Sequence, residues 1–237
     1  MVLDRPEKRI ALSLALLREL ADALAVVTAD PRVAVVVLTG SGSVFCAGAD
    51  LGESDADRAA SPSVANLLQA LMEAPQPVVC VLNGPARAGG VGMVAACDLA
   101  IAPDDVTFAF TEVRLGLVPG MIAVPCLARM APRAAARYFL TGEAFDAAEA
   151  VAIGLLSLTV PAAEVPERAA AVVADLRRGA PAALAATKRL LADVPPMARH
   201  TAFAVTAELS ATFFDSDDGR EGRAAFAQKR PPRWSSG

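Results

Sequence analysis

Hydrophobic and polar positions follow two different periods along this chain, and together they predict an α/β fold. Leucines recur at 14, 17, 20 and 24 with charged residues between them, which predicts a helix over 13–29 that ends before Pro31. Short, β-branched apolar runs bounded by turn residues predict buried strands at 33–38, 77–82, 98–102, 106–110 and 155–160.

Helical patterns occupy most of the rest of the chain. A helix is predicted over 62–73, and another follows the glycine-rich turn after the second strand. Beyond Pro132, helices are expected at 132–140, 146–152, 162–178, 181–192, 200–214 and 217–229. The order strand–loop–helix–strand indicates α/β units around a largely parallel sheet. We therefore expect a core over 1–180 and a C-terminal helical region over 181–237, which must pack on the core or on another subunit.

Composition and charge narrow the class of protein. The 237 residues are 54% hydrophobic, yet charged or turn residues interrupt every apolar run before it reaches transmembrane length. Charges begin at residue 4, so we expect no signal peptide and a cytoplasmic protein. The net charge of −4 and the lack of a long basic block argue against nucleic acid as a partner.

Cysteine and histidine usage predicts neither a metal site nor a redox cofactor. The four cysteines form no CxxC motif and no Cys/His cluster, and they lie in apolar segments typical of reduced core residues. His200 is the single histidine. It lies in a predicted helix, where a structural or solvated role is expected.

Two glycine-rich loops carry the first chemical signal. They are TGSGSVFCAGADLGES at 39–54 and NGPARAGGVGM at 83–93, and each leaves a predicted strand at the same edge of the sheet. Such loops can direct two backbone N–H groups at one point, which is what an oxyanion hole needs. The alternative is a tight structural turn. The second loop lacks the GxGxxG spacing of a dinucleotide-binding turn.

Glu112 is the carboxylate that stands out. It lies in FAFTEVRLGLVPG, just past a short strand and among apolar residues. A buried carboxylate has a raised pKa and can act as a general base or acid. The alternative is a structural salt bridge with Arg114 or Arg87. The other carboxylates expected near this edge are Asp50, Glu53 and Asp98.

The segments VVVLTGSGSVFCAGADL, PVVCVLNGPARAGGVGMVAACDLAIA, FAFTEVRLGLVPG and RYFLTGEAFDAAEAVAIGLL together resemble the crotonase superfamily of enoyl-CoA hydratases and isomerases. They occur in the family's order, and the resemblance runs from about Arg5 to Arg233. It implies a spiral of ββα units with a C-terminal helical trimerisation region, often in hexamers. It also implies an acyl-CoA substrate, with the thioester carbonyl in an oxyanion hole and no further cofactor.

The resemblance assigns roles to individual residues. Ala49 and Gly89 match the two oxyanion-hole N–H groups, and Glu112 matches the second catalytic glutamate of the hydratases. The positions that match residues around the coenzyme A moiety are Ala47, Leu51, Lys8 with its neighbour Arg9, Phe226 and Lys229. For the basic residues among them, an ordinary surface charge is the alternative.

Gly92 departs from the family's pattern. Hydratases of this family carry their first glutamate three positions after the oxyanion-hole glycine, and this chain has a glycine there. Losing an acid/base group costs ~10²–10⁴-fold in rate. The resemblance implies an enoyl-CoA hydratase with one glutamate as the acid/base. The alternatives are a Δ3,Δ2-enoyl-CoA isomerase, which needs one carboxylate, and a non-catalytic acyl-CoA-binding protein.

Overall fold

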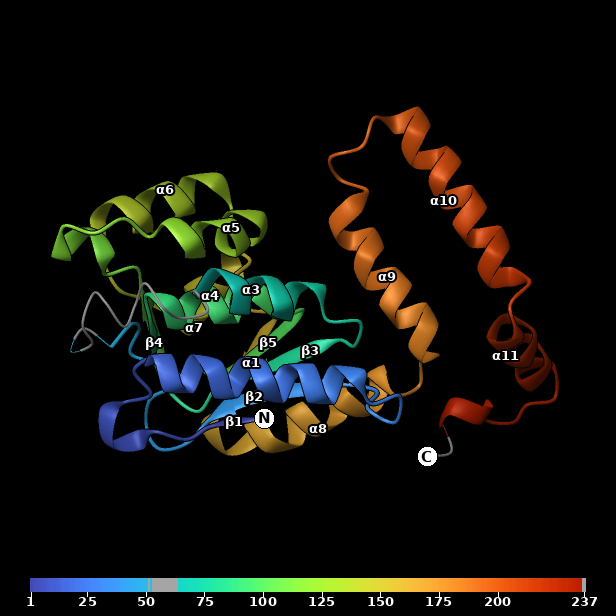
Figure 1. Ribbon diagram of the computed structural model, residues 1–237, viewed down its shortest axis with the longest axis horizontal. Coiled ribbons are helices and arrows are strands. Elements are labelled where there is room, and N and C mark those ends of the chain that lie inside the picture. Colours follow the sequence, from blue (N-terminus) through green and yellow to red (C-terminus); the bar gives the residue numbers. More distant parts are fainter. Residues whose placement is uncertain (51, 53–63, 236–237) are drawn as a thin grey trace.

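A parallel five-stranded sheet forms the centre of the molecule (Figure 1). The computed structural model describes residues 1–50, 52 and 64–235. The strands lie in the order β1 (Val2–Leu3), β2 (Val36–Gly40), β3 (Val78–Val81), β5 (Leu99–Pro103) and β8 (Leu158–Val160). Every neighbouring pair is parallel, as when Val79 pairs with Leu99 and Ile101 with Leu158. The expectation of an α/β fold around a parallel sheet is confirmed.

A smaller sheet of three short strands stands beside the first. Its order is β4 (Ala86–Arg87), β6 (Thr107–Ala109) and β7 (Phe145–Asp146). Phe108 and Phe145 stack across the β6–β7 pair with ring centroids 5.7 Å apart. The predicted strand at 106–110 therefore belongs to this second sheet.

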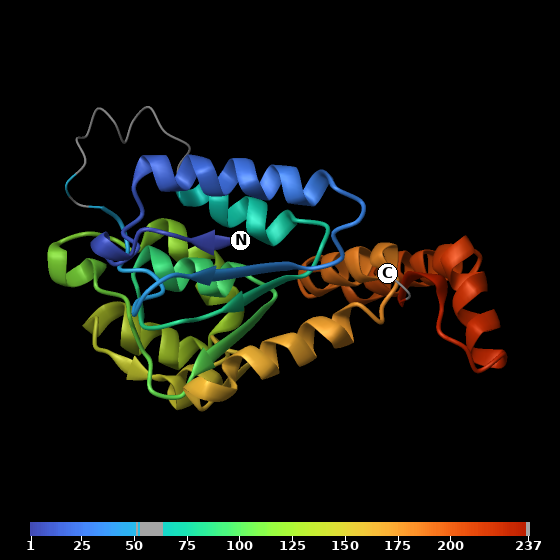
Figure 2. The same ribbon diagram turned by 90° about the horizontal axis from the view of Figure 1, so that it is seen from below.

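Helices cover both sides of the large sheet. Figure 2 shows α1 (Leu14–Ala29) and α3 (Val64–Glu73) on one side and α8 (Val165–Leu176) on the other. Ser13 caps α1 by accepting a hydrogen bond from the Leu16 N–H at 3.2 Å, as expected for a serine before an apolar-periodic run. The short helix α4 (Gly89–Ala96) is buried along almost its whole length.

The remaining elements are η1 (Pro6–Lys8), η2 (Glu112–Leu115), α5 (Gly120–Arg129), α6 (Pro132–Thr141), α7 (Ala147–Ala152), η3 (Ala162–Glu164), α9 (Pro181–Asp193), α10 (Arg199–Phe214), α11 (Asp217–Ala227) and η4 (Arg233–Ser235). The helices after Pro132 match their predicted ranges to within about three residues. The sequence pattern did not predict α5, which has Pro125 inside it.

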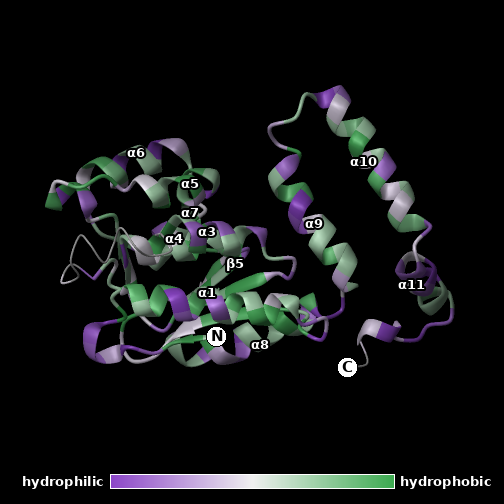
Figure 3. Ribbon diagram, in the orientation of Figure 1, coloured by the Kyte–Doolittle hydropathy of each residue, from purple (hydrophilic) through white to green (hydrophobic). Residues whose placement is uncertain are grey.

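Helices α9, α10 and α11 extend away from the sheet (Figures 1 and 2). Neither α9 nor α10 contains a buried residue, and the exposed apolar side chains of α10 include Phe203 and Phe214. Hydrophobic and hydrophilic residues are both present along the ribbon of α10 (Figure 3). Within the described part of the chain, no helix is both long and apolar enough to cross a membrane. All four cysteines are buried and unbridged, as expected of core residues.

Candidate active site

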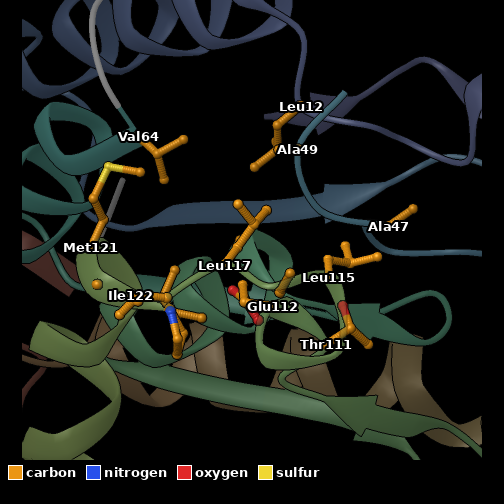
Figure 4. Close-up of a pocket in the computed structure, with 15 residues that line it drawn as sticks. Leu12, Ala47, Ala49, Val64, Thr111, Glu112, Leu115, Leu117, Met121 and Ile122 are labelled. Atoms are coloured by element: carbon orange, nitrogen blue, oxygen red, sulfur yellow. The ribbon is translucent and has the colours of Figure 1, made fainter. Parts of the chain in front are cut away.

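A cavity of about 270 Å³ lies where the two glycine-rich loops meet η2 and the start of α5. Ala47 and Ala49 come from the first loop, Gly89 from the second, and Glu112 from η2. The rest of the lining is mainly aliphatic. Figure 4 shows Glu112 in the middle of the cavity, with Leu117 and Ile122 beside it.

Backbone hydrogen bonds fix the first loop so that one N–H group is left over. Leu12 N donates to Gly48 O at 2.8 Å, and Asp50 N donates to Leu12 O at 3.1 Å. This parallel bridge turns the N–H of the intervening Ala49 to the other side of the loop. Among the described residues, the Ala49 N–H has no acceptor.

The second loop supplies another unused donor. Gly89 is the first residue of α4, where backbone N–H groups have no partner inside the helix. Its N–H also has no acceptor in the part of the chain that is described. A Cβ built on Gly48 would lie 3.0 Å from Ala88 Cβ and 3.8 Å from Gly89 N, so the two loops are in contact at this point. Both donors therefore line one cavity.

Ala88 holds a backbone conformation that alanine rarely adopts. It precedes α4 with φ of 47° and ψ of −118°. Backbone of this kind costs about 1–3 kcal/mol and persists only where the surroundings impose it. Ala88 N donates to Ala109 O at 3.0 Å, and Arg87 N donates to Cys46 O at 2.9 Å. These bonds tie the turn to β6 and to the first loop.

Asn83 holds the two loops in register. Its Oδ1 accepts a hydrogen bond from Gly40 N at 3.1 Å, and its Nδ2 donates to the carbonyls of Gly42 and Val44 at 2.9 and 3.1 Å. A second anchor is the ion pair between Arg5 Nη1 and Asp50 Oδ2 at 2.7 Å. The Arg5 hydrogen bond lowers the pKa of Asp50.

Glu112 is half-buried, and one of its two carboxyl oxygens has no partner in the described chain. Its Oε2 is buried and has no hydrogen-bond partner within the described residues. Burial raises the pKa of this carboxyl above its ordinary value. The alternative of a salt bridge is wrong, because Arg114 Nε donates to Thr141 O and Arg87 donates to Thr107. Glu112 therefore has the environment of a general base or acid.

The other predicted carboxylates are occupied or lie elsewhere. Asp50 pairs with Arg5, and Asp98 pairs with Lys188 Nζ at 2.7 Å, outside the cavity. Glu53 lies outside the described residues. Within the described lining, Glu112 is the single charged side chain.

The residues predicted to surround coenzyme A are spread over the molecule. Ala47 lines the cavity, and Leu51 lies outside the described residues. Lys8 is exposed at the end of η1, next to Arg9, whose carbonyl accepts a hydrogen bond from Ala47 N at 3.1 Å. Phe226 on α11 is 88% exposed, and Lys229 follows that helix. Figures 1 and 2 place α11 at the opposite end of the molecule from the cavity, so one chain alone does not bring these two residues to it.

Sequence reasoning missed the residues after Glu112 that line the cavity, namely Leu115, Leu117, Val118, Met121 and Ile122. The apolar run LGLVPGMI was the available signal. Ile122 has a second contact. A Cβ added at Gly92 would lie 2.4 Å from Ile122 Cγ2 and 2.8 Å from Ile122 Cβ. The site of the missing glutamate is therefore filled from α5.

Comparison with known proteins finds similarity over the full chain. A family model described as enoyl-CoA hydratase/isomerase matches residues 1–237. The chain is 31% identical to enoyl-CoA hydratase EchA19 of Mycobacterium tuberculosis, over 100% of this chain and 92% of that protein. It is 32% identical to 2,3-dehydroadipyl-CoA hydratase of Escherichia coli, over 98% and 92% of the two chains. Among solved structures, AtuE of Pseudomonas aeruginosa superposes with a TM-score of 0.92 at 35% identity, covering 99% of this chain and 95% of that one.

Proposed function

Because the chain belongs to the enoyl-CoA hydratase/isomerase family, we propose that it is an enoyl-CoA hydratase in which Glu112 is the acid/base. Its fold is the crotonase fold expected from the sequence, since it superposes on enzymes of this family. The observation that carries the proposal is the half-buried Glu112, whose Oε2 is buried and has no partner among the described residues, in the same cavity as two unused N–H groups.

The two N–H groups would bind the thioester oxygen of a 2-enoyl-CoA. Glu112, as a carboxylate, takes a proton from water while the water oxygen bonds to C3. The electrons of the C2=C3 bond move onto the thioester oxygen, and the resulting enolate accepts hydrogen bonds from Ala49 and Gly89. Glu112 then returns the proton to C2, which completes the addition of water. Removing one donor of such a pair costs about 2.7–4 kcal/mol of transition-state stabilisation in other enzymes.

Isomerisation of a 3-enoyl-CoA is a second candidate function, and the occupied space at Gly92 favours it. The reaction needs one base and no water. Glu112 removes a proton from C2, the dienolate is held by the same two N–H groups, and Glu112 delivers the proton to C4. Glu112 and the oxyanion hole supply every group in this sequence, whereas typical hydratases use two carboxylates.

The open cavity and the unpaired Glu112 argue against a non-catalytic acyl-CoA-binding protein. Such a protein would be expected to tie the glutamate to an arginine and to fill the cavity with side chains. Arg87 and Arg114 both bond elsewhere. We therefore rank binding without turnover last.

We also propose that the active enzyme is a homotrimer or a hexamer in which 181–237 forms the contacts between subunits. Support comes from α10, where Phe203 is 71% exposed and Phe214 is still 60% exposed although Arg223 of α11 lies over its ring. In that assembly Phe226 and Lys229 would reach the cavity of a neighbouring subunit. Lys8 would approach the nucleotide of coenzyme A from the same chain.

The test compares crotonyl-CoA and a 3-enoyl-CoA as substrates of the purified full-length protein, with Glu112→Gln as the control. Loss of the conjugated enoyl absorbance from crotonyl-CoA, reduced ~10²–10⁴-fold in the control, is expected for a hydratase. Gain of that absorbance from the 3-enoyl-CoA would identify the isomerase. Binding of CoA esters without turnover of either substrate would overturn the proposal.

A further inference from the structure

The contact between Gly92 on α4 and Ile122 on α5 bears on which reaction the site favours. We infer that Ile122 is a specificity-determining residue, because its side chain occupies the space that a carboxylate at position 92 would need. The inference rests on the proposed function, since it concerns the balance between hydration and isomerisation at the same cavity. The three heavy atoms nearest to a Cβ built at Gly92 all belong to Ile122.

Ile122 cannot easily move out of this space. Its Cβ, which is fixed to the backbone, would lie only 2.8 Å from a Cβ at position 92, so rotating the side chain relieves only part of the clash. A β-branched residue in a helix is also nearly confined to one rotamer. Ile122 is 4% exposed and Gly92 is buried, so the two residues meet in the interior of the protein. The Cα of Ile122, in contrast, would lie 3.5 Å from the added Cβ, which is an ordinary contact. The obstacle is therefore the side chain of Ile122 and not the path of α5.

Position 92 lies on the same face of α4 as Gly89. It follows Gly89 by three residues, so it stands one helical turn beyond the proposed oxyanion-hole donor. Ile122 lines the cavity together with Glu112 and Gly89. A side chain that extended past the present position of Ile122 would therefore enter the same cavity as Glu112.

The consequence follows from what a water molecule needs. A bound water is held by about two to four polar partners, and the methyl groups of Ile122 offer none. Among the described side chains that line the cavity, those of Glu112 and Thr111 are the two that could bind a water near C3 of the substrate, and a carboxylate at position 92 would add a third. Proton transfer between carbons needs no water. Ile122 therefore lowers hydration relative to isomerisation.

The experiment compares three variants of the full chain: I122G, the double variant G92E/I122G and the matched control G92Q/I122G. Glutamine has the shape of glutamate but cannot act as an acid or base. Each protein is assayed with crotonyl-CoA and with a 3-enoyl-CoA. We expect G92E/I122G to hydrate crotonyl-CoA at least ~10-fold faster in kcat/KM than either G92Q/I122G or I122G, which is below the full effect of an acid/base group. Its ratio of isomerisation to hydration is expected to fall.

Stability supplies a second readout that does not depend on turnover. We expect G92A to lower the melting temperature in the wild-type background but to have little effect in the I122G background, where the clash is gone. Equal losses in both backgrounds would overturn the inference. So would equal hydration by the glutamate and glutamine variants, or a G92E/I122G protein that unfolds although I122G folds.

Two further results keep the test decisive. If I122G does not fold, I122A with Gly92 retained opens space beside Glu112, and its ratio of isomerisation to hydration is expected to fall. An unchanged ratio would overturn the inference. Failure of the proposed function looks different, because the wild-type protein would then turn over neither substrate faster than Glu112→Gln does.

Discussion

Replacing Lys188 by methionine should show how firmly α9 is held against the core. Lys188 Nζ lies 2.7 Å from Asp98 Oδ2 and donates hydrogen bonds to Leu71 O and Gln76 O at 3.1 and 3.3 Å. Its side chain is 10% exposed, and that of Asp98 is 19% exposed. Methionine keeps most of the apolar stem of lysine but removes the charge and all three donors.

The magnitude follows from what the substitution leaves behind. Breaking a buried ion pair from one side costs about 3–5 kcal/mol, because the remaining charge is uncompensated. Asp98 would keep one partner, the Val78 N–H, which donates to Oδ2 at 2.8 Å. We therefore expect a loss near the lower end, about 3 kcal/mol of the free energy of unfolding. The two carbonyls that lose their donor also favour a loss of at least this size.

The assay is urea unfolding at one fixed protein concentration, since any subunit association would add to the apparent stability. Arg178→Met is the matched control. Arg178 pairs with Asp175 at 3.4 Å, but both side chains are more than three-quarters exposed. Such a pair is worth about 0–1 kcal/mol. If Lys188→Met costs no more than Arg178→Met, water screens the Lys188–Asp98 pair and the reasoning from its burial fails.

Three further predictions concern the cavity and the loops around it. Because burial raises the pKa of Glu112, kcat/KM should rise with pH through a value above 4.5, and a pH profile with its midpoint at or below 4.5 would contradict this. The same shift sets the sign of a stability effect. The stability that Glu112 contributes is fully present below its unfolded pKa and is lost as pH rises through the folded pKa. The melting temperature of Glu112→Gln should therefore rise relative to that of the wild type as pH increases. Gly84→Ala should lower the melting temperature, because its Cβ would lie 2.2 Å from Ser43 O, and overpacking costs about 1–3 kcal/mol. Gly120→Ala, with nothing within 4 Å of the added Cβ, is the control and should change the melting temperature little.

The elements with a strong local signal were predictable from the sequence. The leucines of α1 and the β-branched runs of β2 and β3 each match one period over several residues, so their types were assigned correctly. The two-residue strands β4 and β7 are too short to show any period. Helix α5 begins at a glycine and contains Pro125, which are both poor helix formers, and tertiary packing overrides that local preference.

The candidate site also has features that the sequence predicts and others that it does not. Loop glycines and an isolated carboxylate can be recognised in the sequence itself, and this is how Ala49, Gly89 and Glu112 were predicted. That Glu112 forms no salt bridge could not be predicted, because an arginine two residues away in sequence, Arg114, bonds instead to Thr141 O. Which charges meet depends on the direction of side chains from η2, and spacing alone does not determine that direction.

The contact between Gly92 and Ile122 also changes how an absent catalytic residue should be interpreted. From the sequence alone, Gly92 is the loss of one functional group, and one substitution is expected to place a glutamate there. In the folded chain the position is closed by a residue thirty places further on, in a helix that the pattern did not predict. The two positions are therefore coupled, and their substitutions should not be additive. A glutamate at position 92 needs a residue without a side chain at position 122, whereas Ile122 needs a glycine at position 92. Reactivity at such a site depends on the pair of residues, and either one considered alone gives the wrong expectation.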